Sequence, residues 1–271
     1  MRAAIDWSRP WYASVLDAAG AIEAGVAGGV DAIEAFNAQA RARGLRNQDG
    51  RPVSFVPQSA LPEGMAYEAF IGATGSVPTR DNLHDFFNAL VWLSFPLIKR
   101  QLNALQAAQI ALAGVGKSRG AARDGATIFD ENAALLVVRH GAAGQALVAA
   151  LRAHQWRDVL LERRAAFEAD AELWLFGHAL MEKLVAPYKA ITAHTRVVLA
   201  DDVFFTLEHA ARRDWIDRRV ARDLAERGLS TADFTPLPVL GVPHWWPRQD
   251  AAFYDDATVF RPKRRAAVTE E

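Results

Sequence analysis

Residues 81–113 read DNLHDFFNALVWLSFPLIKRQLNALQAAQIALA and form the strongest helical stretch of the chain. Apolar residues recur at three- and four-residue spacing from Leu83 onward, which gives the segment a wide apolar face. Asp81 is a good N-cap residue, so we expect the helix to begin there. Pro96 lacks a backbone donor and disfavours the α conformation at Phe95, so it should kink or divide the helix.

The rest of the chain divides into further helices and short strands. The expected helices lie at 11–43 (two helices separated at Gly28-Gly29), 145–167 (broken near His154), 171–185 and 204–227 (ending at Gly228). The expected strands lie at 53–56, 67–71 and 194–199, with a β-hairpin over 126–138 that turns at Asp130-Glu131-Asn132. The sequence therefore predicts a helix-rich α+β fold with a few short strands, including one β-hairpin.

The C-terminal part lacks periodicity but is rich in aromatic residues. From Thr231 onward the aromatic residues are Phe234, Trp245, Trp246, Phe253, Tyr254 and Phe260. A disordered tail would lack such residues, so we expect residues 231–262 to be an extended arm packed on the core. Residues 263–271 are expected to be a frayed tail. With no internal repeat and no linker, residues 1–262 are expected to form a single domain.

The composition narrows the classes of protein to consider. The chain has 271 residues, 51% of them hydrophobic, which is enough to bury a sizeable core. Its 31 Lys and Arg residues nearly balance 32 Asp and Glu residues, so net charge does not indicate a nucleic-acid partner. The absence of cysteine excludes disulfides and thiolate metal sites. No apolar run approaches the roughly 20 residues of a membrane span, and the N-terminus lacks a signal-peptide pattern. We therefore expect a cytoplasmic protein.

Four segments together are similar to one bacterial protein family. They are TRDNLHDFFNALVWLSFPLIKRQLNALQ (79–106), TIFDENAALLV (127–137), LFGHALMEKLVAPYKAITAH (175–194) and PHWWPRQDAAFYDDATVFRP (243–262). The phrases HDFFNALVW and EKLVAPYKAITAH are the most specific. The chain resembles the DUF3025 family of unknown function, known mainly from proteobacteria, over about residues 10–262. The resemblance implies one domain and a bacterial source, and it implies no established activity.

Polar residues at the start of the 81–113 segment form the first candidate site. His84 and Asn88 are four residues apart on one helical face, with Asp85 beside them. A histidine, a carboxylate and an amide at a helix N-terminus suit proton transfer or the binding of a metal or phosphate. We therefore take His84, Asp85 and Asn88 as candidate catalytic residues. The alternative is that they hydrogen-bond to a neighbouring loop and only hold the fold.

A nuclease interpretation is a minor alternative for the same segment. A β-hairpin followed by a helix that bears His and Asn resembles the ββα-metal finger of HNH-type nucleases. Strands at 67–71 and 77–80 would supply that shape. Those nucleases place the general-base histidine on the first strand, whereas YEAFI at 67–71 contains no histidine. The match is therefore partial.

Two histidines and a glutamate form the candidate metal site. His178 and Glu182 lie four residues apart on an expected helix and can reach one point, while a turn at Pro187 can bring His194 back over them. Two imidazoles and a carboxylate suit zinc, manganese or non-haem iron. The alternative is that Glu182 pairs with neighbouring lysines and that both histidines are core residues.

Two further patterns do not predict a site. ALAGVGKS at 111–118 fits a relaxed phosphate-loop pattern, but a helix and not a buried strand precedes it, and a poor helix start follows it. We therefore expect a loop without a nucleotide site at 114–125. Trp245, Trp246 and His244 are able to stack on a sugar or a base. Anchoring the arm to the core is the simpler role for these rings.

These patterns leave two classes of function open. The first is a metal-dependent enzyme, for instance a hydrolase, that uses a cleft of His, Glu and Asp residues. The second is a non-catalytic binding or regulatory protein whose polar clusters are structural. His84 and His178 both lie among core residues, where an unpaired polar ring costs about 1–3 kcal/mol. We therefore expect the two helices to pack together and to bring these rings close, with the acids beside them, Asp85 and Glu182, as their partners. Neither class specifies a substrate or a partner.

Overall fold

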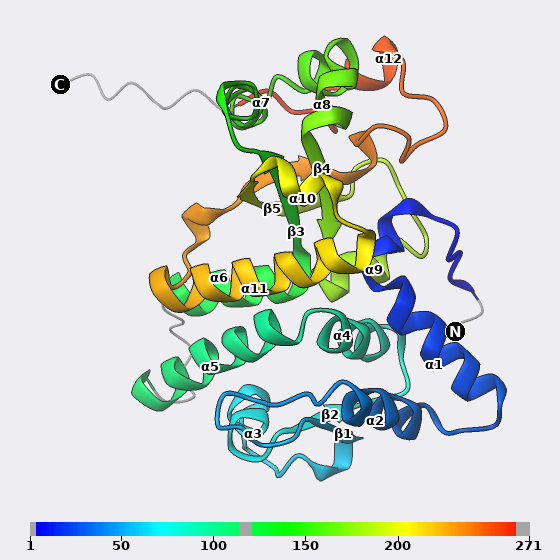
Figure 1. Ribbon diagram of the computed structural model, residues 1–271, viewed down its shortest axis with the longest axis vertical. Helices are drawn as coiled ribbons and strands as arrows, with labels where there is room; N and C mark the ends of the chain where they lie inside the picture. The colour runs from blue at the N-terminus through cyan, green and yellow to red at the C-terminus, as the bar shows by residue number, and fades with distance from the viewer. Residues whose placement is uncertain (1–3, 114–120, 264–271) are drawn as a thin grey trace.

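The computed structural model describes residues 4–113 and 121–263. Figure 1 shows these residues as a stack of layers along the longest axis of the molecule, with N-terminal helices in the lower part and a four-stranded sheet in the upper part. The helix-rich α+β architecture predicted from the sequence is confirmed. Within the described ranges, no helix is both long enough and apolar enough to cross a membrane.

The N-terminal part of the chain consists of helices around one small sheet. The helices are η2 (Pro10–Val15), α1 (Leu16–Ala27), α2 (Ala32–Ala42), η3 (Gln58–Ala60), α3 (Tyr67–Thr74), α4 (Leu83–Ser94) and α5 (Pro96–Ala113). Strands β1 (Ser54–Pro57) and β2 (Ser76–Thr79) pair in parallel. The predicted separation of two helices at Gly28-Gly29 is confirmed, and so is the division of the 81–113 segment at Pro96, which begins α5.

The C-terminal part supplies the four-stranded sheet and its helices. The strands are β3 (Ala133–Arg139), β4 (Ala171–Leu175), β5 (Thr192–Ala200) and β6 (Thr235–Pro238), in the spatial order β4-β3-β5-β6. β3 runs parallel to β5, and the two outer pairs are antiparallel. The helices are α6 (Ala121–Asn132), α7 (Ala142–Arg152), the π-helical turn η4 (Asp158–Glu162), α8 (Arg164–Asp170), α9 (His178–Lys183), α10 (Asp202–Thr206), α11 (His209–Arg227), η5 (Thr231–Asp233), η6 (Val239–Gly241) and α12 (Ala251–Tyr254).

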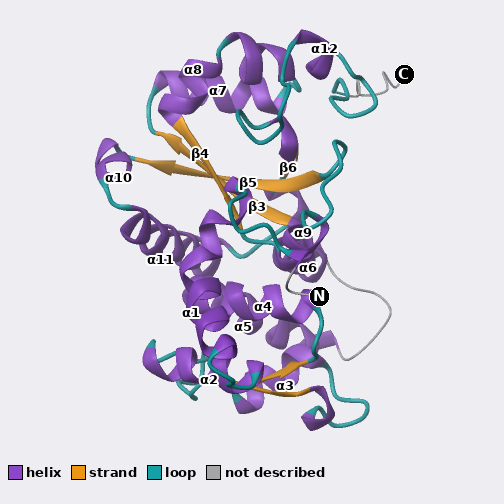
Figure 2. Cartoon of the chain, turned by 90° about the vertical axis from the view of Figure 1, so that its right-hand side faces the viewer, coloured by secondary structure: helices purple, strands orange, loops and turns teal. Residues whose placement is uncertain are grey.

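Both faces of β3 are buried, which explains its uninterrupted apolar run. Leu135 and Val137 belong to the larger hydrophobic core, together with the residues of α4, whereas Leu136 and Val138 belong to a smaller core with α7. Figure 2 shows α7 and α8 on one side of the sheet and α6 and α11 on the other. The sheet therefore separates two cores, and the larger one includes the N-terminal helices.

The β-hairpin predicted over 126–138 is wrong, because the first half of this segment belongs to α6 and only the second half is a strand. Ala126 and Phe129 are buried, whereas Thr127 and Ile128 between them are partly exposed, which is the period of a helix. The β-branched residues favoured a strand locally, but the ring of Phe129 packs in the larger core and stabilises the helix. The chain therefore enters β3 from a helix and not from a tight turn.

Two other segments also differ from prediction. Residues 67–71, predicted as a strand, lie in α3, so the strand pair required by the nuclease interpretation does not precede α4. Residues 171–185, predicted as one helix, form β4 and then the short helix α9, because pairing with β3 overrides the local helical pattern. The predicted break near His154 is confirmed, since this residue has φ 59° just after α7. Gly228 ends α11 as predicted.

The aromatic C-terminal arm is packed against the rest of the chain. Its β6 is an edge strand of the sheet, and its buried side chains include Leu237, Val239, Leu240, Val242, Phe253, Tyr254 and Phe260. The Phe260 ring lies against Gly241, where an added Cβ would come within 2.7 Å of it. The tail from residue 264 onward lies outside the described residues. Residues 114–120, the main part of the loop predicted over 114–125, also lie outside the described residues. The last residues of that predicted loop begin α6.

A side chain from α11 holds the start of α5. Both oxygens of Asp217 accept backbone N–H groups from the first turn of α5, from Leu97 at 3.0 Å and from Ile98 at 2.8 Å. Such donors have no partner within their own helix. Asp217 is 4% exposed, and burial raises its pKa to about 7 against the opposing effect of the two N–H donors. Helix α11 thus caps α5 across the core.

Replacing Asp217 by alanine should destabilise the protein by about 1–2 kcal/mol at pH 5, the usual effect of losing a helix cap. This loss should shrink toward pH 8. A carboxyl group with a raised pKa stabilises the folded state below its unfolded pKa, here 3.8, and that contribution disappears as the pH rises through about 7. Urea denaturation at both pH values measures the difference. Glu226→Ala, at an exposed carboxylate on the same helix, is the control, and an equal loss at both pH values would contradict the prediction.

Truncating Phe260 to alanine should lower the free energy of unfolding by about 3–5 kcal/mol, because it removes buried apolar surface and leaves a cavity. Removing the whole arm after Ser230 should lower the melting temperature further, since the sheet then loses β6. Val203→Ala, at a side chain that is 69% exposed, is the control. Circular dichroism melts test both changes, and a truncated chain that melts like the full chain would show that the arm adds no stability.

Candidate metal centre

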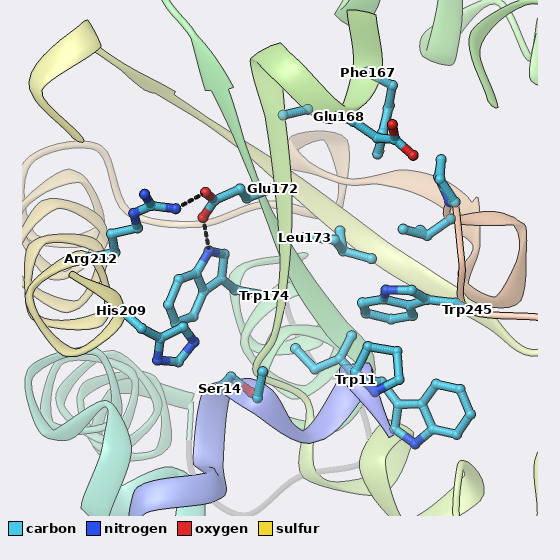
Figure 3. A pocket seen from close by; sticks show the side chains of 16 residues that line it. Trp11, Ser14, Phe167, Glu168, Glu172, Leu173, Trp174, His209, Arg212 and Trp245 are labelled. Carbon is cyan, nitrogen blue, oxygen red and sulfur yellow. Dashed lines mark hydrogen bonds and ion pairs between the residues drawn. The ribbon is translucent and has the colours of Figure 1, made fainter. Parts of the chain in front are cut away.

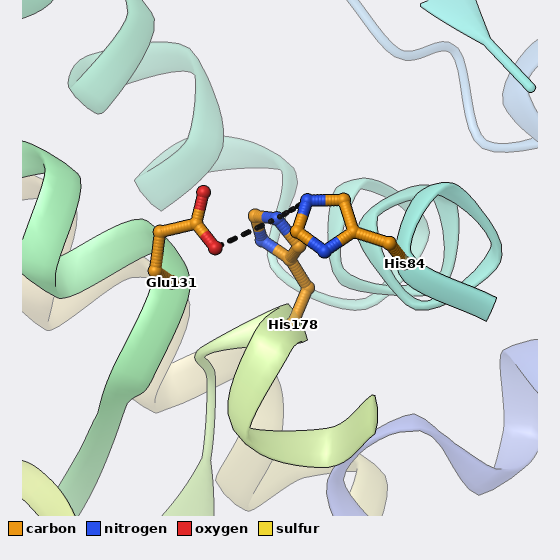
Figure 4. A group of neighbouring side chains, drawn as sticks. All are labelled: His84, Glu131 and His178. Atoms are coloured by element: carbon orange, nitrogen blue, oxygen red, sulfur yellow. Dashed lines mark hydrogen bonds and ion pairs between the residues drawn. The ribbon is translucent and has the colours of Figure 1, made fainter. Parts of the chain in front are cut away.

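Two imidazole rings and a carboxylate meet where α4, α6 and α9 pack together. Nε2 of His84 on α4 lies 3.0 Å from Nε2 of His178, the first residue of α9. Oε2 of Glu131 on α6 lies 3.6 Å from the same His178 nitrogen. Figure 4 shows the three side chains converging from three different helices. Their ligand atoms all lie within 4.8 Å of one another. We refer to His84, Glu131 and His178 as the His–Glu–His group.

A glycine allows the segments that carry this group to approach closely. Gly177 joins β4 to α9, and a Cβ placed on it would lie 2.5 Å from the backbone nitrogen of Ala133 and 2.6 Å from the carbonyl oxygen of Glu131. Real Cβ atoms do not come so close to backbone. The backbone N–H of Gly177 also donates to the carbonyl oxygen of Ala133 at 2.8 Å. The first residue of α9 is thereby held beside the last turn of α6.

One side of the His–Glu–His group faces solvent. The side chains of His84 and Glu131 are 32% and 33% exposed, whereas that of His178 is 4% exposed. Nδ1 of His84 lies 3.1 Å from Oε2 of Glu182, which is 39% exposed. The group is therefore anchored on a buried imidazole and open on the side of His84 and the two glutamates.

The surroundings keep the buried imidazole neutral. Burial lowers the pKa of His178 to about 4, and the nearby carboxylate of Asp130 opposes this effect only in part. Burial and then the charge of Asp130 raise the pKa of Glu131, and burial raises the pKa of Glu68 on α3. A neutral imidazole beside crowded carboxylates is the combination that a divalent cation stabilises.

The predicted proximity of His84 and His178 is confirmed by the 3.0 Å separation of their Nε2 atoms. The acids that accompany them differ from prediction. Glu182 contacts His84 and not its own helical neighbour His178. The carboxylate of Asp85 is directed to Arg80 instead of to the His84 ring, since it accepts the backbone N–H of Arg80 at 2.6 Å and that residue's guanidinium at 2.9 and 3.1 Å.

The N-cap of α4 differs from the predicted residue, and Asn88 is bonded away from the His–Glu–His group. The N-cap is Asn82 and not Asp81, since the Asn82 side chain accepts the backbone N–H of Asp85 at 2.7 Å. Asn88 lies one turn beyond His84 and is buried. Its Oδ1 accepts from Lys99 at 2.9 Å, and its Nδ2 donates to the hydroxyl of Tyr67 at 3.1 Å. Asn88 therefore belongs to a buried polar network behind the group.

His194 lies apart from the other two residues of the predicted metal site. It is on β5, paired in register with Ala133, and its side chain is exposed. Its ring lies against Phe234, with centroids 6.3 Å apart. Partial desolvation of the ring lowers its pKa, and the charge of Lys183 adds to this effect. Among the described residues, the group of mutually close ligand atoms includes neither His194 nor Glu182.

Sequence reasoning missed Glu131 and Asp130, which it placed in a hairpin turn. When the segment is interpreted as a helix, Asp130 lies on the same buried face as Ala126 and Phe129. A carboxylate in such a position needs a partner, and this was the signal available in the sequence. The partner is Lys99, whose Nζ lies 2.5 Å from Oδ1 of Asp130.

Comparison with known proteins gives a family and no activity. The sequence matches the family described as "Protein of unknown function (DUF3025)" over residues 53–264, which is most of the chain. The chain belongs to the DUF3025 family. All three members of the His–Glu–His group lie within the matched region. No curated protein and no solved structure matched this DUF3025 chain.

A separate cavity of about 380 Å³ lies beside β4, between η2, α11 and the arm. Figure 3 shows Trp11, Trp174 and Trp245 around it, with His209 stacked on Trp174 at a centroid distance of 4.4 Å. Arg212 and Glu172 form an ion pair at one end. No member of the His–Glu–His group lines this cavity. Trp245 therefore contributes to a cavity wall as well as anchoring the arm.

The His178 ring should remain neutral down to about pH 4 in the metal-free protein. A histidine with a lowered pKa stabilises the folded state above its unfolded pKa of 6.5, and this contribution is lost as the pH falls toward about 4. NMR titration of the imidazole nitrogens measures the pKa directly. A ring that titrates near 6.5 would show that His178 is not held in a buried, neutral state.

Proposed function

We propose that the His–Glu–His group binds a divalent metal ion and that the protein is a metal-dependent enzyme of hydrolytic type. The observation that carries the proposal is the spacing of the ligand atoms. With metal–nitrogen bonds of about 2.0–2.1 Å, the edges of a tetrahedral site are about 3.3–3.4 Å long. The observed separations from Nε2 of His178 are 3.0 Å to His84 and 3.6 Å to Glu131. Small side-chain movements would match them to a tetrahedron.

The charges around the group support a cation. His178 is buried and neutral, as a metal ligand must be. The carboxylate of Glu182 lies behind His84, on its Nδ1 side, and carboxylates of this kind commonly orient metal-binding histidines. The raised pKa of Glu131 reflects burial and the repulsion of Asp130, and a cation at the group would relieve both effects.

Three protein ligands leave a fourth position for water, which is the arrangement of catalytic zinc sites. A bound metal lowers the pKa of such a water to about 7 and so supplies a nucleophile at neutral pH. The exposed sides of His84, Glu131 and Glu182 give a substrate access to that position. Two imidazoles and one carboxylate favour zinc, with manganese and iron as alternatives.

Metal analysis of untagged protein tests the proposal. We expect one Zn²⁺ per chain by equilibrium dialysis and elemental analysis. His84→Ala and Glu131→Gln should weaken binding by about 100-fold or more, since loss of an outer-shell partner alone costs about 10–100-fold. His194→Ala should leave the affinity unchanged. Circular dichroism melts must show that each variant is folded.

The controls distinguish this site from the one predicted from sequence. If His194→Ala weakens zinc binding and Glu131→Gln does not, the ligands are His178, Glu182 and His194, and the proposed group is wrong. Hydrolysis of p-nitrophenyl acetate and bis(p-nitrophenyl) phosphate by zinc-loaded protein, lost in Glu131→Gln, would support the enzyme. Zinc binding without turnover of either ester would favour a non-catalytic binding protein.

A further inference from the structure

Nδ1 of His178 is a buried ring nitrogen that makes no hydrogen bond of normal geometry, although the backbone of Asp130 lies near enough to the ring to favour its protonation. The nearest carboxylate oxygen is Oδ2 of Asp130, 3.8 Å away. That distance is too long for a hydrogen bond, although both residues are buried. An unsatisfied polar atom in such a place normally costs about 1–3 kcal/mol. The separation of these two atoms therefore needs an explanation.

The hydrogen bonds of the two rings supply the explanation. Nδ1 of His84 faces the carboxylate of Glu182, which is an acceptor, so in a neutral His84 the proton is on Nδ1 and Nε2 carries a lone pair. The 3.0 Å contact between the two Nε2 atoms then requires His178 to donate from Nε2. Nδ1 of His178 consequently carries a lone pair and faces an acceptor oxygen of Asp130. Two acceptors do not bond, which accounts for the distance of 3.8 Å.

A metal at the His–Glu–His group reverses this arrangement. The metal takes the lone pair of Nε2, so a neutral His178 must carry its proton on Nδ1. We propose that Asp130 is the positioning residue that accepts this proton's hydrogen bond, so that metal binding switches His178 from its Nε2–H to its Nδ1–H tautomer. Each imidazole of the group would then have its own carboxylate, Glu182 behind His84 and Asp130 behind His178. This inference rests on the proposed metal site.

Lys99 fixes the orientation of Asp130 for this role. Its Nζ donates to Oδ1 of Asp130 at 2.5 Å and to Oδ1 of Asn88 at 2.9 Å, and it is 4% exposed. One carboxylate oxygen of Asp130 is thereby occupied, and the other is left toward His178. An ammonium group only donates, so any residue at position 130 must present an acceptor to Lys99.

The Asp130→Asn variant tests whether Asp130 accepts the hydrogen bond of His178. With its oxygen required by Lys99, the asparagine presents its NH₂ to Nδ1 of His178. That NH₂ donates to the lone pair and holds the ring as Nε2–H, the tautomer that cannot bind metal through Nε2. We expect zinc affinity to fall by about 10–100-fold. The variant also leaves the charge of Lys99 uncompensated, so circular dichroism melts must show that it is folded at the temperature of the binding measurement. Asp217→Asn, a buried Asp-to-Asn change on α11, is the matched control and should leave zinc affinity unchanged.

Long-range ¹H–¹⁵N spectra of the imidazoles provide the second measurement. In the wild type, His178 should be Nε2–H without metal and Nδ1–H with Zn²⁺, and in Asp130→Asn it should stay Nε2–H at the same zinc concentration. Undiminished zinc affinity in folded Asp130→Asn would overturn the inference, and so would wild-type His178 that keeps its Nε2 proton when zinc is bound. A wild type that binds no zinc would instead refute the proposed function, and the metal-free tautomer would still be measured.

Discussion

The buried ammonium group of Lys99 constrains the interior where α3, α4, α5 and α6 meet. An uncompensated charge in such a place costs several kcal/mol, so the surrounding helices must supply acceptors. Asp130 comes from α6 and Asn88 from α4, and Asn88 also bonds to Tyr67 on α3. These bonds fix the last turn of α6 next to α4. Glu131 follows Asp130 directly, so the same ion pair sets the distance between Glu131 and the histidines.

The parts of the fold that sequence predicts well depend on local chemistry. Proline interrupts a helix in almost any context, and Pro96 divides α4 from α5. Gly228 ends α11 in a conformation that favours glycine, with φ 69°. The errors depend on contacts made elsewhere. Residues 171–175 have the composition of a helix or a strand, and pairing with β3 decides between them. Phe129 lies in a segment of β-branched residues, and its packing in the larger core decides for the helix.

In the candidate site, too, local chemistry predicts some features and distant contacts decide the others. His84 and His178 were identified because polar rings on apolar helix faces need partners, an argument that requires no coordinates. Which partners they find is a matter of tertiary geometry. The spacing of His178 and Glu182 predicts that both side chains reach one point. Helix α9 is short, however, and directs Glu182 to His84. The position of His194 depends on the register of β5 against β3, which no local pattern reveals.

Gly177 has a consequence for the order of folding. The contact of His84 with His178 spans 94 residues of chain, and its contact with Glu182 spans 98. Such contacts close late, since the entropy of long loops must be overcome first. In the folded state the backbone of 131–133 lies against the start of α9 at Gly177, just beyond the paired strands β3 and β4. The three proposed ligands would therefore not be assembled in partly folded chains. At the proposed site, a zinc ion would bind the folded protein and stabilise it by mass action, unlike the zinc of small finger domains, which drives folding itself.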